Sequence, residues 1–373
     1  MTTPAAAGPA AAGGAPMVMM PPPPAGGGAA PLGGAPTAGP VTPAIPAAAQ
    51  PVGGSGPVAG SSPGAAAAPY AMPQNRLASI GAGGATGDEL FEQAMDAGRD
   101  VIAAMLAQIR GYIPIHFAVS LIWERTGAVT AWLATSEGAS YIPLGVRIPQ
   151  DVRLAVTDPV VGRELWEKTA AAGGANPLEV VVRHAEARQM AAPGERVLAI
   201  AGSVPLAQVI DWAAAVGARP VSVDLQKSAA PDLGVMLHRC QVAMPWEWRQ
   251  ANAFSAQDRL RIAARHMHMA AMAGHLHGAA CETVMRLFEE RKPISDQLWE
   301  QVRNERYIAL VEYESAVRTR GQGGSEPARA LATARAAEVI ECLRNYDTVD
   351  GCADLLYASR LAGAPLSLDA AVA

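Results

Sequence analysis

The stretch IPIHFAVSLIWERTGAVTAWLAT, residues 113–135, decides the class of fold that this chain can adopt. Two of its runs, 113–123 and 128–135, are rich in β-branched and aromatic residues. Between them lies Glu124-Arg125-Thr126-Gly127, a short polar segment that ends in glycine. Two such runs joined by a few residues that include glycine are typical of a β-hairpin. The sequence therefore predicts a hairpin at the start of a sheet.

Helical and strand patterns alternate on both sides of the hairpin. Residues 88–110 place apolar side chains three and four apart, which predicts a helix. Segments 140–148 and 151–157 predict a second pair of strands. Further along, the patterns predict helices at 160–172, 177–190 and 205–216 and strands at 196–201 and 220–225. This order predicts an α/β layered domain over residues 85–230.

Strand patterns stop after residue 230, and long helical patterns follow. Ser255 with Asp258 resembles a capping box at the start of a helix. The predicted helices run from 255 to 293, 295 to 320, 327 to 346 and 350 to 360. Short breaks between long helices are typical of an antiparallel bundle, which we expect over residues 231–373. The predicted fold class is therefore α+β, with an α/β domain followed by an all-α domain.

The N-terminal part of the chain has a different composition. Residues 1–84 hold 17 of the 30 prolines, and the first charged residue is Arg76. Proline removes backbone donors, and the few large side chains leave little to bury against the entropy of ordering. The sequence predicts a disordered arm over residues 1–84 with polyproline II character. Its role as a spacer, a ligand for proline-binding modules, a secretion feature or an inert linker is left open.

Composition excludes several classes of function. The net charge is −5, and no cluster of five or more Lys and Arg occurs, which argues against nucleic-acid binding. The chain lacks an uninterrupted run of 18 apolar residues, so we expect no membrane insertion. No signal peptide is visible at the N-terminus. We expect a cytoplasmic protein, and secretion or envelope association by a non-Sec route stays open, as does the oligomeric state.

The four cysteines are far apart in the sequence. Cys240, Cys281, Cys342 and Cys352 form no Cys-x-x-Cys pair, which argues against a zinc ribbon. A disulfide between Cys342 and Cys352 is one interpretation of this spacing. Buried free thiols are the favoured interpretation, because cysteine is among the most frequently buried residue types.

A histidine-rich segment lies within the predicted helix 255–293. On a single helix, His266 and His277 share one border of the apolar stripe, but they are too far apart along the axis for one metal ion. Only His277 and Cys281 have the i, i+4 spacing that lets two side chains share an ion. We favour structural histidines here and keep His277 and Cys281 as the candidate metal ligands.

The second candidate site is His184-Ala185-Glu186 on the predicted helix 177–190. Zinc-dependent nucleobase deaminases use a His-x-Glu of this kind, followed by a Pro-Cys-x-x-Cys that supplies the other ligands. The order of elements over residues 100–225 resembles that fold. Leu206 and Val209 follow Pro205 where the two cysteines would stand, so the ligand set is incomplete. A metal-dependent enzyme on a deaminase-like scaffold, using His184 and Glu186, is therefore the alternative hypothesis.

Two tryptophans mark the junction of the predicted domains. Trp246 and Trp248 follow Met244-Pro245. In an extended segment this alternate spacing directs both rings to the same side, against a neighbouring element or a partner. Packing between domains is the favoured interpretation, and both residues are candidates for partner binding.

Four features together carry a resemblance to a known family. They are the neutral arm, the segment 244–248, the His/Met/Ala-rich segment 265–281, and Asp350-Gly351-Cys352-Ala353-Asp354-Leu355-Leu356. In these the chain resembles mycobacterial Ala/Pro-rich proteins of unknown function, similar to the C-terminal region of the type VII secretion-associated protein EspK. The resemblance covers most of the chain after the arm and brings no catalytic residues with it.

These observations predict a non-enzymatic accessory or adaptor protein. We expect it to bind protein partners, which the resemblance implies are type VII secretion substrates or machinery. We expect no cofactor and no complete set of catalytic residues.

Overall fold

A computed structural model describes residues 76–81, 87–109, 115–137, 141–170, 176–224, 231–319 and 327–363. The predicted arm lies outside these residues except at its end, where Arg76–Ser79 form the short helix α1. In this short segment the structure differs from the prediction of disorder. The reason is that Leu77 and Ile80 bury their side chains in the core.

The predicted hairpin forms the centre of a five-stranded sheet. Strands β1 (Phe117–Trp123) and β2 (Val129–Thr135) pair antiparallel, and Gly127 in the turn adopts a positive φ of 84°. Strand β5 (Arg196–Gly202) pairs antiparallel with β1, and β6 (Arg219–Ser222) pairs parallel with β5. The strand order is β4-β2-β1-β5-β6. The expected hairpin and α/β layering are confirmed.

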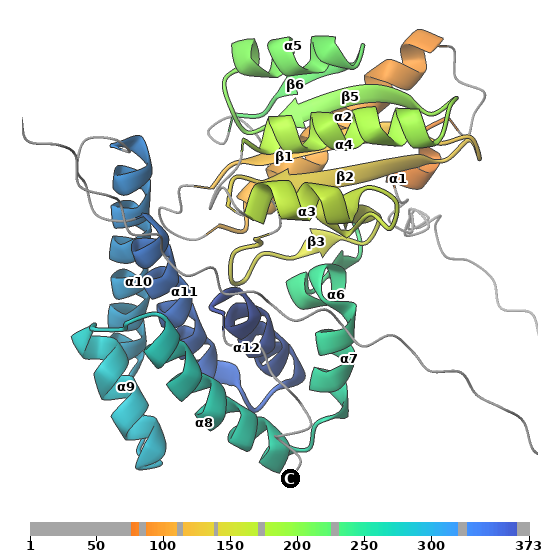
Figure 1. The fold of residues 1–373 in the computed structure, drawn as a ribbon. Helices are drawn as coiled ribbons and strands as arrows, with labels where there is room; N and C mark the ends of the chain where they lie inside the picture. Colours follow the sequence, from red (N-terminus) through yellow and green to blue (C-terminus); the bar gives the residue numbers. More distant parts are fainter. Residues whose placement is uncertain are drawn as a thin grey trace, which may run out of the picture. The chain divides into compact units, whose positions relative to one another are not determined.

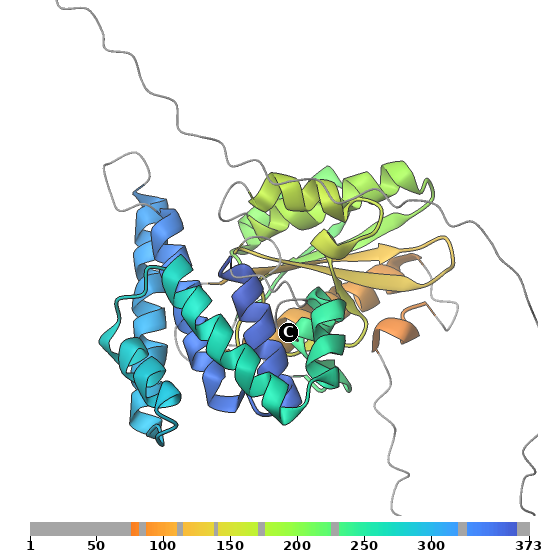
Figure 2. The same ribbon diagram turned by 60° about the horizontal axis from the view of Figure 1, so that its bottom comes forward.

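Helices cover both faces of this sheet (Figures 1 and 2). Helix α2 (Gly87–Leu106) packs on one face, against β1, β5 and β6. Helices α4 (Pro177–Ala191) and α5 (Leu206–Ala215) lie on the other face, and α3 (Gly162–Ala170) packs beside α4. Asn176 caps α4 by accepting a hydrogen bond from the Leu178 amide, and Pro177 occupies the first turn, so the helix begins where the sequence predicts.

The prediction that segments 140–148 and 151–157 pair with each other is wrong, because the strand residues in each of them pair elsewhere. Strand β3 (Ile148–Pro149) pairs antiparallel with β7 (Met236–Leu237), a strand in the region expected to contain helices only. Strand β4 (Val152–Leu154) instead joins the edge of the main sheet, parallel to β2. The residues after it form a 3-10 turn, η1 (Ala155–Thr157). Local patterns of hydrophobicity show that a segment is extended, but they do not show which strand it will pair with.

Helices make up the rest of the described chain. Their bounds are α6 (Arg239–Ala243), α7 (Pro245–Ala253), α8 (Ala256–Ala273), α9 (Ala279–Glu289), α10 (Asp296–Arg318), α11 (Pro327–Cys342), the 3-10 turn η2 (Leu343–Asn345) and α12 (Val349–Leu361). The capping box of Ser255 and Asp258 is present, and Ser295 caps α10. The helical character of the chain after β7 and two of its helix starts are therefore confirmed.

Two expectations for this region are wrong. The helix predicted over 255–293 is broken between α8 and α9, where Gly274 ends α8 and His275 adopts a positive φ of 46°. A Cβ on Gly274 would overlap the side chain of Ala336 on α11, so close helix packing requires glycine there. The segment around Trp246 is the helix α7 and not an extended strand, because Pro245 occupies its first turn.

The buried apolar side chains of the sheet region and of the helices form a continuous core cluster. It includes Ile122 on β1, Val181 on α4 and Leu355 on α12, all with no exposed surface. The division of the chain at residue 230 stays a prediction. Among the described helices, none combines the length and hydropathy needed to cross a bilayer.

Candidate functional site

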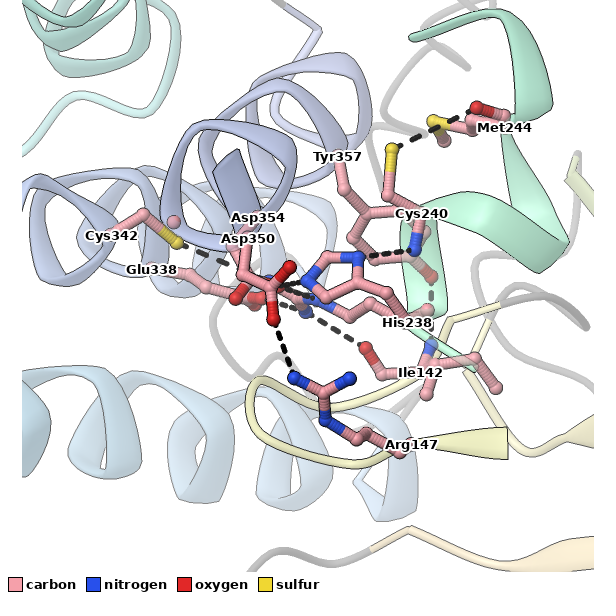
Figure 3. A network of polar contacts seen from close by, with 12 residues as sticks. Ile142, Arg147, His238, Cys240, Met244, Glu338, Cys342, Asp350, Asp354 and Tyr357 are labelled. Carbon is pink, nitrogen blue, oxygen red and sulfur yellow. Dashed lines mark hydrogen bonds and ion pairs between the residues drawn. The ribbon is translucent and has the colours of Figure 1, made fainter. Parts of the chain in front are cut away.

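Charged side chains meet in the interior between the residues before β3 and helices α6, α11 and α12 (Figure 3). Arg239, in the first turn of α6, is 1% exposed. Its Nε donates to Asp354 Oδ1 at 2.5 Å, and its Nη1 donates to Glu338 Oε1 at 2.5 Å and to the Ile142 carbonyl at 2.9 Å. One guanidinium therefore connects two helices to the chain that follows the hairpin. We call this arrangement and the groups joined to it below the charge network.

Two contacts extend the charge network to the sheet. Arg335 on α11 donates from Nη2 to Glu137 Oε2 at 2.5 Å, and Glu137 lies just after β2. Tyr141 donates its hydroxyl hydrogen to Glu338 Oε2 at 2.7 Å, and the Arg335 guanidinium lies 3.3 Å from the centroid of the Tyr141 ring. The helical region is thereby connected to the sheet region by buried ionic contacts.

Helix α10 adds a third group of charges. The Nε of Arg306 lies 3.2 Å from Glu341 Oε2, and its Nη1 lies 3.8 Å from Glu338 Oε2. Arg303 donates from Nε to Glu341 Oε1 at 3.0 Å. Guanidinium groups thus surround the two glutamates of α11.

These surroundings decide the ionisation of Glu338 and Glu137, the two carboxyls that contact Arg335. Burial raises the pKa of Glu338, but Arg239, Arg306 and Arg335 outweigh burial and hold that pKa below its usual value. Burial also raises the pKa of Glu137, and Arg335 offsets only part of this effect. Glu338 is therefore held as an anion at the centre of the network, and Glu137 is protonated more readily than Glu338.

Such an arrangement positions structural elements. Moving charges out of water is costly, and their attraction compensates only when every partner is in place. Tyr357 adds to this fit, because its hydroxyl accepts a hydrogen bond from the Ile142 amide at 2.8 Å while its ring lies 4.5 Å from the Arg239 guanidinium. The charge network therefore fixes α6, α11 and α12 against the sheet region in one arrangement.

The structure separates the two residues of the deaminase-like hypothesis. His184 lies on α4 with no exposed surface, and its Nε2 is 2.8 Å from Asp158 Oδ2. Burial lowers the pKa of His184, and Asp158 offsets part of this effect. Glu186, two residues along the same helix, is exposed. The two side chains therefore do not converge on a common position.

The second candidate pair is also divided. His277 is exposed in the loop before α9, and Cys281 is buried in the first turn of α9, so they do not share one helix. Burial raises the pKa of the Cys281 thiol, and the neighbouring Glu305 carboxylate accepts hydrogen bonds from the amides of Ala280 and Cys281. Within the described ranges, no three His, Cys, Asp or Glu side chains come together as a metal site would require. All four cysteines are buried and free.

The two tryptophans of α7 have different environments. Trp246 is 46% exposed. Trp248 is half-buried, and its ring stacks on His238 with 5.1 Å between centroids. His238 Nε2 lies 3.3 Å from Asp354 Oδ1, so Trp248 packs against the edge of the charge network. The two rings therefore do not point the same way, since helical geometry places residues two apart on different faces.

Sequence reasoning missed the residues of the charge network. One feature of the sequence indicates them in retrospect. Residues 327–342, PARALATARAAEVIEC, mix Ala with Arg and Glu and have no continuous polar face. A helix of this composition that packs on several sides must bury some of its charges. The charge partners, however, lie up to 198 positions away in the sequence, as Glu137 does from Arg335.

Comparisons with known proteins found a family and a solved structure that resemble this chain. The family model described as the EspK C-terminal domain matches residues 111–338. A solved structure of a fragment of the conserved hypothetical protein Rv3899c from Mycobacterium tuberculosis is similar at 14% identity and a TM-score of 0.40, covering 74% of this chain and 98% of that fragment. The chain matches none of the curated proteins. The range matched by the family contains Glu137, Arg239 and Glu338.

Proposed function

We propose that this chain, which belongs to the EspK C-terminal domain family, is a non-enzymatic accessory or adaptor protein that binds protein partners of type VII secretion. Family membership supports the link to secretion. The observation that carries the binding role is the solvent-exposed Trp246 on the rigidly held helix α7.

Helix α7 presents this tryptophan from a fixed base. Its first turn is held by the stacking of Trp248 on His238, and Glu247 lies 3.4 Å from the Arg360 guanidinium on α12. Tryptophan is enriched among the residues that dominate binding energy at interfaces. Because α7 is already ordered, this chain loses little conformational entropy when a partner covers Trp246.

The chemistry of the interior favours binding over catalysis. Burial raises the pKa of the Cys240 thiol to about 12, which keeps it protonated and a poor nucleophile near neutral pH. The acids of the charge network are paired with guanidinium groups, and His184 is paired with Asp158. These groups stabilise the fold, and the exposed surface of α7 is left for recognition.

The test is affinity capture with the full chain as bait in lysate from a mycobacterium with active type VII secretion. Trp246→Ser is compared with Trp166→Ser, because Trp166 on α3 is exposed to a similar extent, 43% against 46%. We expect type VII substrates or machinery to be enriched by the wild type and by Trp166→Ser, and lost with Trp246→Ser. Equal capture by both variants would reject Trp246 as the contact. Enrichment of no such protein would reject the adaptor role.

A further inference from the structure

We infer that a cleft between the end of α2 and helices α10, α11 and α12 binds a small organic anion that carries a carboxylate or phosphate group. The cleft has a volume of about 770 Å³. This size lies within the usual range for small-molecule sites. Its walls come from Ala107 and Leu144 on the side of the sheet region and from Arg306 and Arg344 on the helical side. This inference goes beyond the proposed adaptor role and does not depend on it.

The charges of the wall favour an anion. Three arginines line the cleft, Arg303, Arg306 and Arg344, against two carboxylates, Glu341 and Asp354. Both carboxylates already have cationic partners, since Arg239 lies 2.5 Å from Asp354 and Arg303 lies 3.0 Å from Glu341. The lining side chains therefore carry one more positive than negative charge. Each of the three arginines also lies within 4 Å of a carboxylate, which is Glu300 or Glu341 for Arg303, Glu341 or Glu338 for Arg306, and Asp296 for Arg344.

Arg306 is the group that points most directly to a ligand. Its side chain is only 3% exposed, yet its Nε and Nη1 have no hydrogen-bond partner among the described residues. The carboxylates of Glu341 and Glu338 lie near it without hydrogen-bond geometry, and Glu341 Oε2 also has no such partner. Buried charged donors are expensive to leave unsatisfied. The fork of a guanidinium matches the paired oxygens of a carboxylate or phosphate.

Arg344 provides a second cation at the mouth of the cleft. It donates to Asp296 at 2.7 Å, but the Asp296 side chain is 88% exposed. An ion pair of this kind contributes little to stability and exchanges readily with solvent or a ligand. Arg344 is therefore available to an anion that enters from the surface, while Arg306 is positioned deeper in the wall.

The test measures binding of two probes, inorganic phosphate and succinate, to the full chain by isothermal titration calorimetry. Ala107→Trp places a large ring in the cleft and leaves every charge in place, because Ala107 is an exposed residue of its wall. Ala214→Trp on α5 is the matched control, as Ala214 is also exposed and does not line the cleft. Arg344→Gln removes the outer cation. Thermal melts establish that each variant folds.

We expect saturable binding of at least one probe, unchanged in Ala214→Trp. Binding should be at least about tenfold weaker in Arg344→Gln, which loses a charge-assisted hydrogen bond, and at least about tenfold weaker in Ala107→Trp, whose ring occupies the cleft. The tighter probe identifies the ligand as a phosphate or a carboxylate. No saturable binding of either probe to the wild type would overturn the inference. Binding that survives both Ala107→Trp and Arg344→Gln would overturn it as well. If Ala107→Trp does not fold, Arg344→Gln decides the outcome.

Discussion

The apolar core around the sheet and the charge network are equally inaccessible to solvent but are held together by different forces. Val119, Leu133 and Ile200 in the sheet have no exposed surface, and Arg239 and Glu338 in the charge network are 1% exposed. Apolar contacts are non-directional, so the sheet interior loses stability gradually as atoms are removed. A buried charge instead depends on each of its partners. Single substitutions should therefore cost more in the network than in the sheet.

The largest effect is expected from Arg239→Met, which keeps an apolar stem and removes the charge. Glu338 and Asp354 would lose their shared partner, and the free energy of unfolding should fall by about 3–5 kcal/mol. Urea denaturation of the full chain measures this.

Two variants serve as the comparison. Ile200→Val in the sheet should cost only about 0.5–1.5 kcal/mol. Arg147→Met, which breaks the half-exposed pair with Asp350 seen in Figure 3, should cost at most about 1 kcal/mol. The comparison fails if Arg239→Met costs no more than Ile200→Val.

A pH dependence follows from a buried histidine outside the charge network. His266 on α8 is 1% exposed, and burial lowers its pKa to about 4, with a further contribution from Arg265. The unfolded chain takes up this proton below about pH 6.5, while the folded chain does not until about pH 4. Stability present above pH 6.5 should therefore be lost as the pH falls through this window, by about 3 kcal/mol in total.

His266→Leu separates this effect from that of the carboxyls. The lowered pKa values of Glu338 and Asp354 cause loss of stability only at more acidic pH, below the unfolded values of 4.5 and 3.8. The lowered pKa of His184 acts in the same direction as that of His266 and is common to both proteins. We expect the variant to show a smaller fall in unfolding free energy between pH 7 and pH 5 than the wild type. Identical slopes would contradict the assignment, and His268→Gln, on the exposed part of α8, is the control.

A smaller effect is expected at the start of α12, which carries Asp354 into the charge network. A Cβ on Gly351 would overlap the carbonyl oxygen of Asn345. Gly351→Ala should shift the backbone and cost about 1–3 kcal/mol in a urea or thermal melt. Gly87→Ala is the matched control, since Gly87 begins α2 with open space around it and should be neutral or slightly stabilising. An equal response at both positions would argue against tight packing at α12.

The substitutions His184→Ala and His277→Ala are expected to have no effect on the metal content of the chain. His184 is paired with Asp158 while Glu186 is exposed, and His277 and Cys281 lie in different environments. We therefore expect mass spectrometry of the purified full chain to find no stoichiometric zinc, with no change in His184→Ala or His277→Ala. Stoichiometric zinc that is lost only in His184→Ala would revive the deaminase-like hypothesis. Loss only in His277→Ala would place a metal site beside α9.

The local features of the chain were predictable from sequence. The hairpin, the helix start at Pro177 and the capping box of Ser255 with Asp258 depend on residues a few positions apart. Hydrophobic periodicity, turn chemistry and helix capping depend on residues within a few positions of one another. The sequence by itself therefore determined the class of each long element. The family resemblance, based on composition and short segments, was confirmed by the match to residues 111–338.

Only the tertiary structure decided how these elements meet. The pairing of β3 with β7, the break at Gly274 and the ionic contacts of Glu137 with Arg335 join residues that are distant in sequence. A charged residue on a helix is usually solvated. The composition of residues 327–342 indicates in retrospect that some charges are buried, but it does not show that Glu338 lies among three guanidinium groups. Burial and partner identity are properties of the packed chain. The sequence therefore determined the class of the long elements, and packing decided where some of them break, how they pair and which of their charges are buried.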